Sequence, residues 1–194
     1  HNCAISSMKT AKDISAAILT EDVPVSTEFA LPETLPNGLT AGDTGELGIF
    51  IGIHTDAPYT STLRLIPRIV TLGIGCRRDA PMETIFAVVK ETLEEHRIDT
   101  RAVGCVASID VKADEAGLLA CAKVLKAQTV FYTADELNAV PGEFAESEFV
   151  RKTVGVGNVC ERAALCGGGT LIIPKTAKNG VTVAAAVKEW RIEF

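Results

Sequence analysis

The chain has 194 residues, of which 47% are hydrophobic and 5% aromatic, and it carries a net charge of −6 at pH 7. This composition predicts a globular protein with an aliphatic core, and the acidic charge argues against nucleic acid as a partner. No apolar run reaches the roughly 20 residues of a membrane helix, so we expect no membrane partner.

The first 62 residues predict a small α/β region. Apolar residues at helical spacing indicate a helix over 8–19, and two short apolar runs predict strands over 23–29 and 47–53. The intervening segment 31–46 is rich in Pro, Gly and Thr, which is typical of a loop. Because these elements are too few for a complete domain, we expect other segments to complete the region.

Residues 63–194 predict a second α/β domain, with a mixed, mostly parallel sheet flanked by helices. Strand patterns alternate with helical patterns here, which is typical of a sheet covered by helices. Pro67 is expected to mark the start of the first strand, because proline is poorly tolerated inside a central strand. The predicted strands cover residues 69–74, 102–109, 129–132, 170–174 and 181–187, and short helices are predicted from Ser147 and Val159.

Capping residues and apolar stripes place the other helices of this domain. We expect Asp79 or Ala80 to cap the helix after the first strand and Asp114 to cap the next one. Thr133 and Glu136 have the spacing of a capping box for a third helix. The buried faces of the first two helices are predicted to hold Ile85, Val88, Val89 and Leu93, and Leu118, Leu119, Ala122 and Leu125.

Loops with glycines and cations follow the predicted strands. In an open α/β sheet, ligands bind at the carboxyl ends of the strands, so these loops predict a site for an anionic ligand. The first loop holds Gly73, Gly75, Cys76, Arg77 and Arg78. Arg78 stands where a dinucleotide fingerprint needs its third glycine, so we reject a Rossmann site. Arginine beside a helix N-terminus favours carboxylate or phosphate, the alternative being that both arginines are solvated surface charges.

Three later loops add candidate substrate-binding residues. Lys112 lies among acidic residues and is either an orienting cation or part of a surface ion pair. Gly155 lets the backbone approach a ligand, and Ser147 begins a short helix nearby. Lys175 lies in a basic segment, PKTAKNG, that is predicted to be a loop. We predict that all four residues contribute to the same site.

Glu115 and Glu161 are the candidate catalytic residues, because a carboxylate within reach of water can act as a general base. The alternative is that both complement helix dipoles. The chain has three histidines and no nucleophile elbow, so we expect neither a serine–histidine–aspartate triad nor a histidine-bound metal. His54 is the histidine for which we expect a functional role, since His1 is terminal and His96 lies at the C-terminal end of a predicted helix.

The six cysteines show no CxxC spacing, which argues against a structural zinc site. We expect reduced thiols in a cytoplasmic protein, most of them packed as small hydrophobic residues. Cys76 is the candidate functional thiol because it lies in the first glycine loop. The chain begins at His1 without a signal-peptide pattern, and we interpret it as a fragment of a longer protein.

Four segments resemble, in order and spacing, the CbiG family of cobalamin-biosynthesis proteins. They are TLRLIPRIVTLGIGCRRDAPMETI, SIDVKADEAGL, SEFVRKTVGVGNVCERAAL and LIIPKTAKNGVTVAAA. The resemblance spans residues 47–187 and is strongest in the C-terminal domain, which the family shares with CobE. It implies that residues 1–62 belong to the family's central region and 63–194 to its C-terminal domain. The family's N-terminal domain has no counterpart in these 194 residues.

This resemblance implies a cobalt-precorrin-5A hydrolase of the anaerobic pathway. Such an enzyme opens the δ-lactone of a cobalt-bearing macrocycle and releases acetaldehyde to give cobalt-precorrin-5B. Cobalt arrives in the substrate, so no separate cofactor is implied. The substrate's acetate and propionate carboxylates would match the cations Arg77, Arg78, Lys112 and Lys175.

As a hypothesis for the mechanism, we expect water to attack the lactone carbonyl with Glu115 or Glu161 as the candidate base. Backbone N–H groups near Gly75 or Gly155 would stabilise the oxyanion. Two alternatives stay open: a corrinoid-binding or carrier module that releases no acetaldehyde, and glycine loops that serve folding and dimerisation alone. Essential groups in the absent N-terminal domain, a homodimer and contacts with neighbouring pathway enzymes also stay open.

Overall fold

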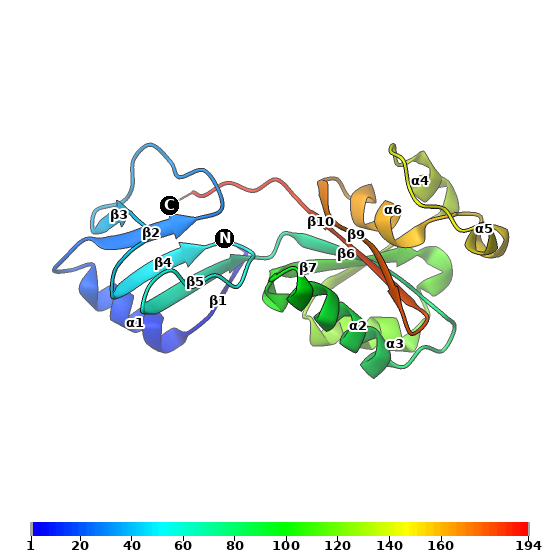
Figure 1. Ribbon diagram of the computed structural model, residues 1–194, viewed down its shortest axis with the longest axis horizontal. Helices are drawn as coiled ribbons and strands as arrows, with labels where there is room; N and C mark the ends of the chain where they lie inside the picture. Colours follow the sequence, from blue (N-terminus) through cyan, green and yellow to red (C-terminus); the bar gives the residue numbers. More distant parts are fainter. Residues whose placement is uncertain (1, 194) are drawn as a thin grey trace. The chain divides into compact units, whose positions relative to one another are not determined.

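The computed structural model describes residues 2–193 and consists of two compact units (Figure 1). The first unit contains residues 2–68, 97–102 and 190–193, and the second contains Ile69–His96 and Val103–Glu189. The domain boundary expected between residues 62 and 63 falls inside strand β5 (Ser61–Pro67), which belongs to the sheet of the first unit.

The first unit is a five-stranded sheet in the order β1-β5-β4-β2-β3. Its strands are β1 (Cys3–Ile5), β2 (Val23–Thr27), β3 (Leu39–Ala41), β4 (Leu47–Ile51) and β5, and β1 alone among them pairs antiparallel. Helix α1 (Met8–Ala17) buries Ile14 in the core beside β-branched residues of β2 and β4. The predicted helix and two strands are confirmed, whereas β3 lies within the segment predicted to be a loop.

The second unit is a five-stranded sheet in the order β8-β7-β6-β10-β9. Strands β6 (Val70–Cys76), β7 (Val103–Ile109) and β8 (Gln128–Tyr132) pair in parallel. Strand β10 (Val181–Val187) runs antiparallel to both β6 and β9 (Thr170–Lys178), so four of the five strands share one direction. The predicted mixed, mostly parallel α/β sheet is confirmed.

Helices cover both faces of this sheet (Figure 1). Helices α2 (Met82–Glu95) and α3 (Ala116–Val124) lie on one face. Helix α6 (Val159–Cys166) packs on the other, with α4 (Ala134–Ala139) and α5 (Glu148–Val154) beyond it. The predicted apolar stripe of α2 is fully buried, as are most of the predicted α3 positions. Leu119 is the exception at 37% exposure, because it faces solvent from α3.

Two predicted helix caps are wrong. Helix α2 starts after Pro81 and α3 after Glu115, and neither residue makes a side-chain capping bond. Asp114 pairs with Arg78 instead. The Thr133–Glu136 capping box of α4 is confirmed, since both reciprocal bonds are present.

Pro67 and Pro174 both belong to strands, and each differs from the prediction in its place there. Pro67 is the last residue of β5 and does not start β6. Pro174 and Lys175 belong to β9, so the predicted basic loop shrinks to the hairpin turn around Gly180. Proline is tolerated there because β9 is an edge strand.

Gly73 lets α6 approach the sheet closely. A Cβ atom at this position would lie 1.8 Å from the carbonyl oxygen of Cys160 in the first turn of α6. Any side chain on Gly73 would therefore push α6 away from β6. This contact sets the N-terminus of α6 beside the carboxyl end of β6.

Candidate functional site

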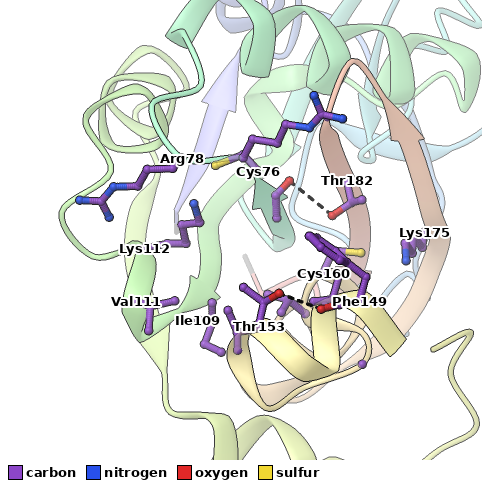
Figure 2. Close-up of a pocket in the computed structure, with 17 residues that line it drawn as sticks. Cys76, Arg78, Ile109, Val111, Lys112, Phe149, Thr153, Cys160, Lys175 and Thr182 are labelled. Atoms are coloured by element: carbon purple, nitrogen blue, oxygen red, sulfur yellow. Dashed lines mark hydrogen bonds between the residues drawn. The ribbon is translucent and has the colours of Figure 1, made fainter. Parts of the chain in front are cut away.

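A cavity of about 590 Å³ lies at the carboxyl ends of β6 and β7. Helix α5, the first turn of α6 and the β9–β10 hairpin complete its walls (Figure 2). This is the position that the sequence predicted for a ligand. The predicted binding residues that line it are Gly75, Cys76, Arg77, Arg78, Lys112 and Lys175.

Three predicted binding residues lie outside the cavity wall. Gly73 is covered by α6. Ser147 caps α5 by accepting a hydrogen bond from the backbone N–H of Val150 at 3.4 Å. Gly155 ends α5 in the left-handed region at φ 78°, and its carbonyl accepts a bond from Asn138. Ser147 and Gly155 therefore shape α5, which itself lines the cavity.

The cavity also has an apolar wall that sequence analysis missed. Ile109 and Val111 follow β7, and α5 contributes Phe149, Val150 and Val154. Phe149 is 78% exposed, although an aromatic ring of this size is usually covered. Figure 2 shows Phe149 and Thr153 along the same side of the cavity as Ile109. The apolar spacing of 149, 150 and 154 was the signal in the sequence, because it marks one face of a helix.

Arg78 is held outside the centre of the cavity by Asp114. Two parallel hydrogen bonds of 3.0 and 2.9 Å join its guanidinium to the carboxylate, and both side chains are exposed. These bonds raise the pKa of Arg78 and lower that of Asp114. In Figure 2 the Arg78 side chain points outward, away from Thr182 and Cys160. The pair links the loop after β6 to the loop after β7.

Lys112 is bound to a buried carboxylate. Its Nζ donates to Glu115 Oε2 at 3.0 Å, and the backbone N–H of Asp79 donates to Glu115 Oε1 at 2.6 Å. Glu115 is 2% exposed. Burial by itself would raise the pKa of Glu115, but the bonds from Lys112 and Asp79 outweigh it and lower that pKa. Asp79 has a left-handed backbone at φ 55°, which this bond helps to hold.

Glu161 has a similar structural environment. It is 6% exposed and accepts hydrogen bonds from the Asn158 amide and from the backbone N–H of Lys175, the latter at 2.8 Å. That N–H is available because β9 bulges there: Pro174 and Lys175 together face Ala184. Neither Glu115 nor Glu161 lines the cavity, and both have oxygens bonded within the protein. Their assignment as general bases stays a prediction.

Arg77 and Lys175 differ from the other two cations. Within residues 2–193 neither side chain forms a salt bridge with a carboxylate, and both line the cavity. The backbone N–H of Arg77 donates to the carbonyl of Gly180 at 3.1 Å. A Cβ on Gly180 would lie 2.8 Å from Arg77 Nε, so a side chain at position 180 would displace the guanidinium.

Two thiols, of Cys76 and Cys160, also line the cavity. Burial raises the pKa of both, that of Cys160 to about 11, and the charge of Lys112 offsets part of this effect at Cys76. Both therefore stay protonated near neutral pH. All six cysteines carry free thiols.

Arg162 is a further residue that sequence analysis did not single out. Its guanidinium is buried, donates to the carbonyls of Leu137 and Val140 at 3.1 and 3.2 Å, and bonds Glu146 at 3.1 Å. The Phe144 ring stacks under it at 4.4 Å. Arg162 thus ties the segment between α4 and α5 to α6, which fixes the start of the apolar wall.

His54 lies in the first unit, with its ring 2.9 Å from Glu28. Over residues 2–193, no three side chains of His, Cys, Asp or Glu gather closely enough to hold a metal ion. No helix in this part of the chain is long and apolar enough to cross a membrane.

Comparison with known proteins gives consistent matches. A family model described as cobalamin synthesis G C-terminus matches residues 70–186. The chain is 36% identical over 142 residues to cobalt-precorrin-5A hydrolase of Salmonella typhimurium, covering 72% of this chain and 40% of that protein. It is 34% identical over 121 residues to CobE of a Sinorhizobium species, covering 60% and 79%. The crystal structure of a CobE protein matches with a TM-score of 0.58 at 31% identity, over 62% of this chain and 91% of that one. The chain thus spans well under half the length of the Salmonella relative.

Proposed function

Because the chain belongs to the cobalamin synthesis G C-terminus family, we propose that it binds the substrate of a cobalt-precorrin-5A hydrolase and takes part in its hydrolysis. The observation that carries the proposal is one cavity that combines an apolar wall with unpaired cations. A cobalt-corrinoid intermediate has matching chemistry, since its ring is largely apolar and its periphery bears carboxylates. No resident cofactor is proposed, because the cobalt belongs to the substrate.

The proposed reaction has two steps. Water adds to the δ-lactone carbonyl and the acyl C–O bond breaks, which leaves a carboxylate on the macrocycle and a hydroxyl on the two-carbon unit. The C–C bond between that unit and the macrocycle then breaks. The hydroxyl loses its proton, acetaldehyde leaves, and the electron pair stays in the conjugated ring.

The cavity residues can bind, orient and polarise in this reaction. Cations near the lactone would stabilise the negative charge that develops on its oxygen, as would backbone N–H groups at the turn after Gly75. Glu115 and Glu161 act in this proposal as positioning residues, since Glu115 holds the side chain of Lys112 and Glu161 the backbone of Lys175. Their role as a base would require one of them to leave its present partners.

A second candidate function is a corrinoid-binding or carrier module. One observation favours it: among residues 2–193, no carboxylate and no imidazole lines the cavity, so its wall offers no obvious general base. A homodimer and contacts with neighbouring pathway enzymes stay predictions.

The deciding experiment incubates the chain with cobalt-precorrin-5A without oxygen, traps acetaldehyde and records the absorption spectrum. Acetaldehyde with a changed spectrum supports the hydrolase. A changed spectrum without acetaldehyde supports the carrier, and an unchanged spectrum contradicts both.

The same assay tests the base. Glu115→Gln and Glu161→Gln, with the exposed Glu94→Gln as a matched control, should all keep turnover within about tenfold if the two carboxylates only hold other groups. A loss of 10²–10⁴-fold in one variant, of the size expected for a general base, would assign that role to its carboxylate.

A further inference from the structure

The four cations predicted for the cavity fall into two pairs that differ in their bonding. Arg78 is held by Asp114 through two hydrogen bonds, and Lys112 is held by Glu115 at 3.0 Å. Arg77 and Lys175 line the same cavity without a carboxylate partner anywhere in residues 2–193. A charge that is already neutralised by a bidentate partner contributes less to ligand binding than one that is not.

The backbone around the two unpaired cations is held in place by the fold. Arg77 follows β6, and its main chain is bonded to Gly180 at the turn of the β9–β10 hairpin. Lys175 lies at the bulge of β9, where Glu161 accepts a bond from its backbone N–H and not from its ammonium. The bulge therefore satisfies Glu161 while the Lys175 side chain stays available to the cavity, at the side that Figure 2 shows opposite Lys112.

The cavity that holds the two cations also has apolar lining residues. Val159 and Cys160 of α6 and Phe149 and Val150 of α5 line the same cavity. Lys175 is half-buried and lines the cavity. A ligand that fills this space would meet both apolar groups and cations.

We propose that Arg77 and Lys175 are the residues that bind the peripheral carboxylates of the corrinoid, whereas Arg78 and Lys112 serve to hold the loops after β6 and β7. This inference rests on the proposed function for the identity of the ligand. It separates four cations that the sequence alone treats as equivalent. Arg77 offers a planar fork that suits bidentate carboxylate binding, and Lys175 offers a point charge.

The test uses two stable probes that differ in charge. Cobyrinic acid is a cobalt corrinoid with free carboxylates, and its fully esterified form is a neutral corrinoid with the same ring. Calorimetric titration of the 194-residue chain with each probe gives the affinities. The variants are Arg77→Gln, Lys175→Gln, the double variant, Arg78→Gln and Lys178→Gln, the last as a control on the same strand outside the cavity.

We expect Arg77→Gln and Lys175→Gln each to weaken binding of the acid about tenfold, and the double variant about a hundredfold. The affinity of every variant for the ester should stay within about twofold of that of the unchanged chain, because the ester has no carboxylate for Arg77 or Lys175 to bind. Arg78→Gln and Lys178→Gln should change acid binding by less than about threefold. Arg77→Lys should recover part of the loss, which shows that charge and not folding is responsible.

Two results would overturn the inference. One is acid binding by the double variant equal to that of the unchanged chain, and the other is a loss for Arg78→Gln as large as that for Arg77→Gln. Either result leaves the proposed function standing if the unchanged chain still releases acetaldehyde from cobalt-precorrin-5A or binds the acid. If the unchanged chain binds neither probe and does not alter cobalt-precorrin-5A, the proposed function fails as well.

Discussion

In the first unit, a carboxylate of the protein itself binds backbone N–H groups beyond the carboxyl end of one of two parallel strands. In the second unit, the carboxyl ends of β6 and β7 border a cavity. Glu28 follows β2, and its two oxygens accept the backbone N–H groups of Ile53 and His54, both at 3.0 Å, after β4. The same carboxylate lies 2.9 Å from the His54 ring. The position where an α/β sheet would bind an anion is therefore filled by an internal anion.

The second unit treats its strand ends differently. The carboxylates there, Glu115 and Glu161, are turned toward the loops they hold and leave the cavity wall without negative charge. Arg77 and Lys175 remain available to a ligand. In the first unit the protein's own carboxylate thus occupies the strand ends, whereas in the second unit the nearby carboxylates bond away from the cavity.

The largest expected effect on stability comes from Asp99, a buried carboxylate of the first unit that is held by the protein's own cations. It is 7% exposed and bonds Arg64 at 2.5 Å and Arg101 at 2.7 and 2.9 Å. Asp99→Asn leaves two arginines short of their shared carboxylate, and we expect a loss of about 3 kcal/mol in the free energy of unfolding. Urea denaturation measures it, and the exposed pair variant Asp56→Asn should cost less than about 1 kcal/mol. Equal losses in both variants would contradict this account.

The pH dependence of stability follows from the same carboxylate. Burial alone would raise the pKa of Asp99, but hydrogen bonds and charge from Arg101 and Arg64 lower it from 3.8 to about 2. A depressed pKa gives stability that is present above the unfolded value and is lost as the pH falls. Between pH 4 and pH 2 the unchanged chain should therefore lose about 2 kcal/mol that Asp99→Asn does not lose. Parallel curves for the two proteins would show that Asp99 is not responsible.

Glu115 gives the next largest effect, and it acts on the second unit. Glu115→Gln keeps an acceptor for the Asp79 N–H but turns an amide toward the Lys112 ammonium, so we expect about 2 kcal/mol less stability. Because the pKa of Glu115 is lowered from 4.5, the difference from the unchanged chain should shrink as the pH falls below that value. Thermal unfolding at several pH values measures it. Unchanged stability would argue that this carboxylate is held for chemistry and not for structure.

Sequence periodicity predicted most of the elements because it depends on neighbouring residues. The buried face of α2 and the capping box of α4 need only residues three or four positions apart. Strand β5 was not predicted, and its residues 63–67 were assigned to the C-terminal domain, because β5 is apolar and only residues 68 and 69 separate it from β6. The two strands belong to different sheets, and that choice depends on partners far away in the sequence.

The site was predicted in part for the same reason. The carboxyl ends of β6 and β7 and six lining residues follow from the strand–loop–helix pattern. Which cations are neutralised does not, because Arg78 and Asp114 are 36 positions apart and meet only when two loops come together. The bulge at Lys175 depends likewise on pairing with β10. Local patterns located the cavity, whereas a long-range contact determines that Arg78 is paired.

Glu28 tests the other side of the comparison with a smaller effect. Glu28→Gln keeps one acceptor for two backbone N–H groups and loses the contact with His54, so we expect about 1 kcal/mol less stability. The affinity for cobyrinic acid should not change, because Glu28 belongs to the first unit and does not line the cavity. Denaturation and titration on the same samples measure both quantities. A change in affinity would show that the closed strand end contributes to binding after all.

Phe149 gives the smallest expected effect, and it isolates the apolar wall from the cations. Its ring is 78% exposed, so Phe149→Ala should leave stability within about 0.5 kcal/mol. A corrinoid ring packed against it would cover that surface, and we expect three- to tenfold weaker binding of cobyrinic acid and of its neutral ester alike. The control is Val124→Ala, an exposed apolar residue of α3 outside the cavity. Unchanged binding of both probes would mean that Phe149 does not contact the ring, whereas an equal loss for both probes shows that apolar contact and charge act separately in this cavity.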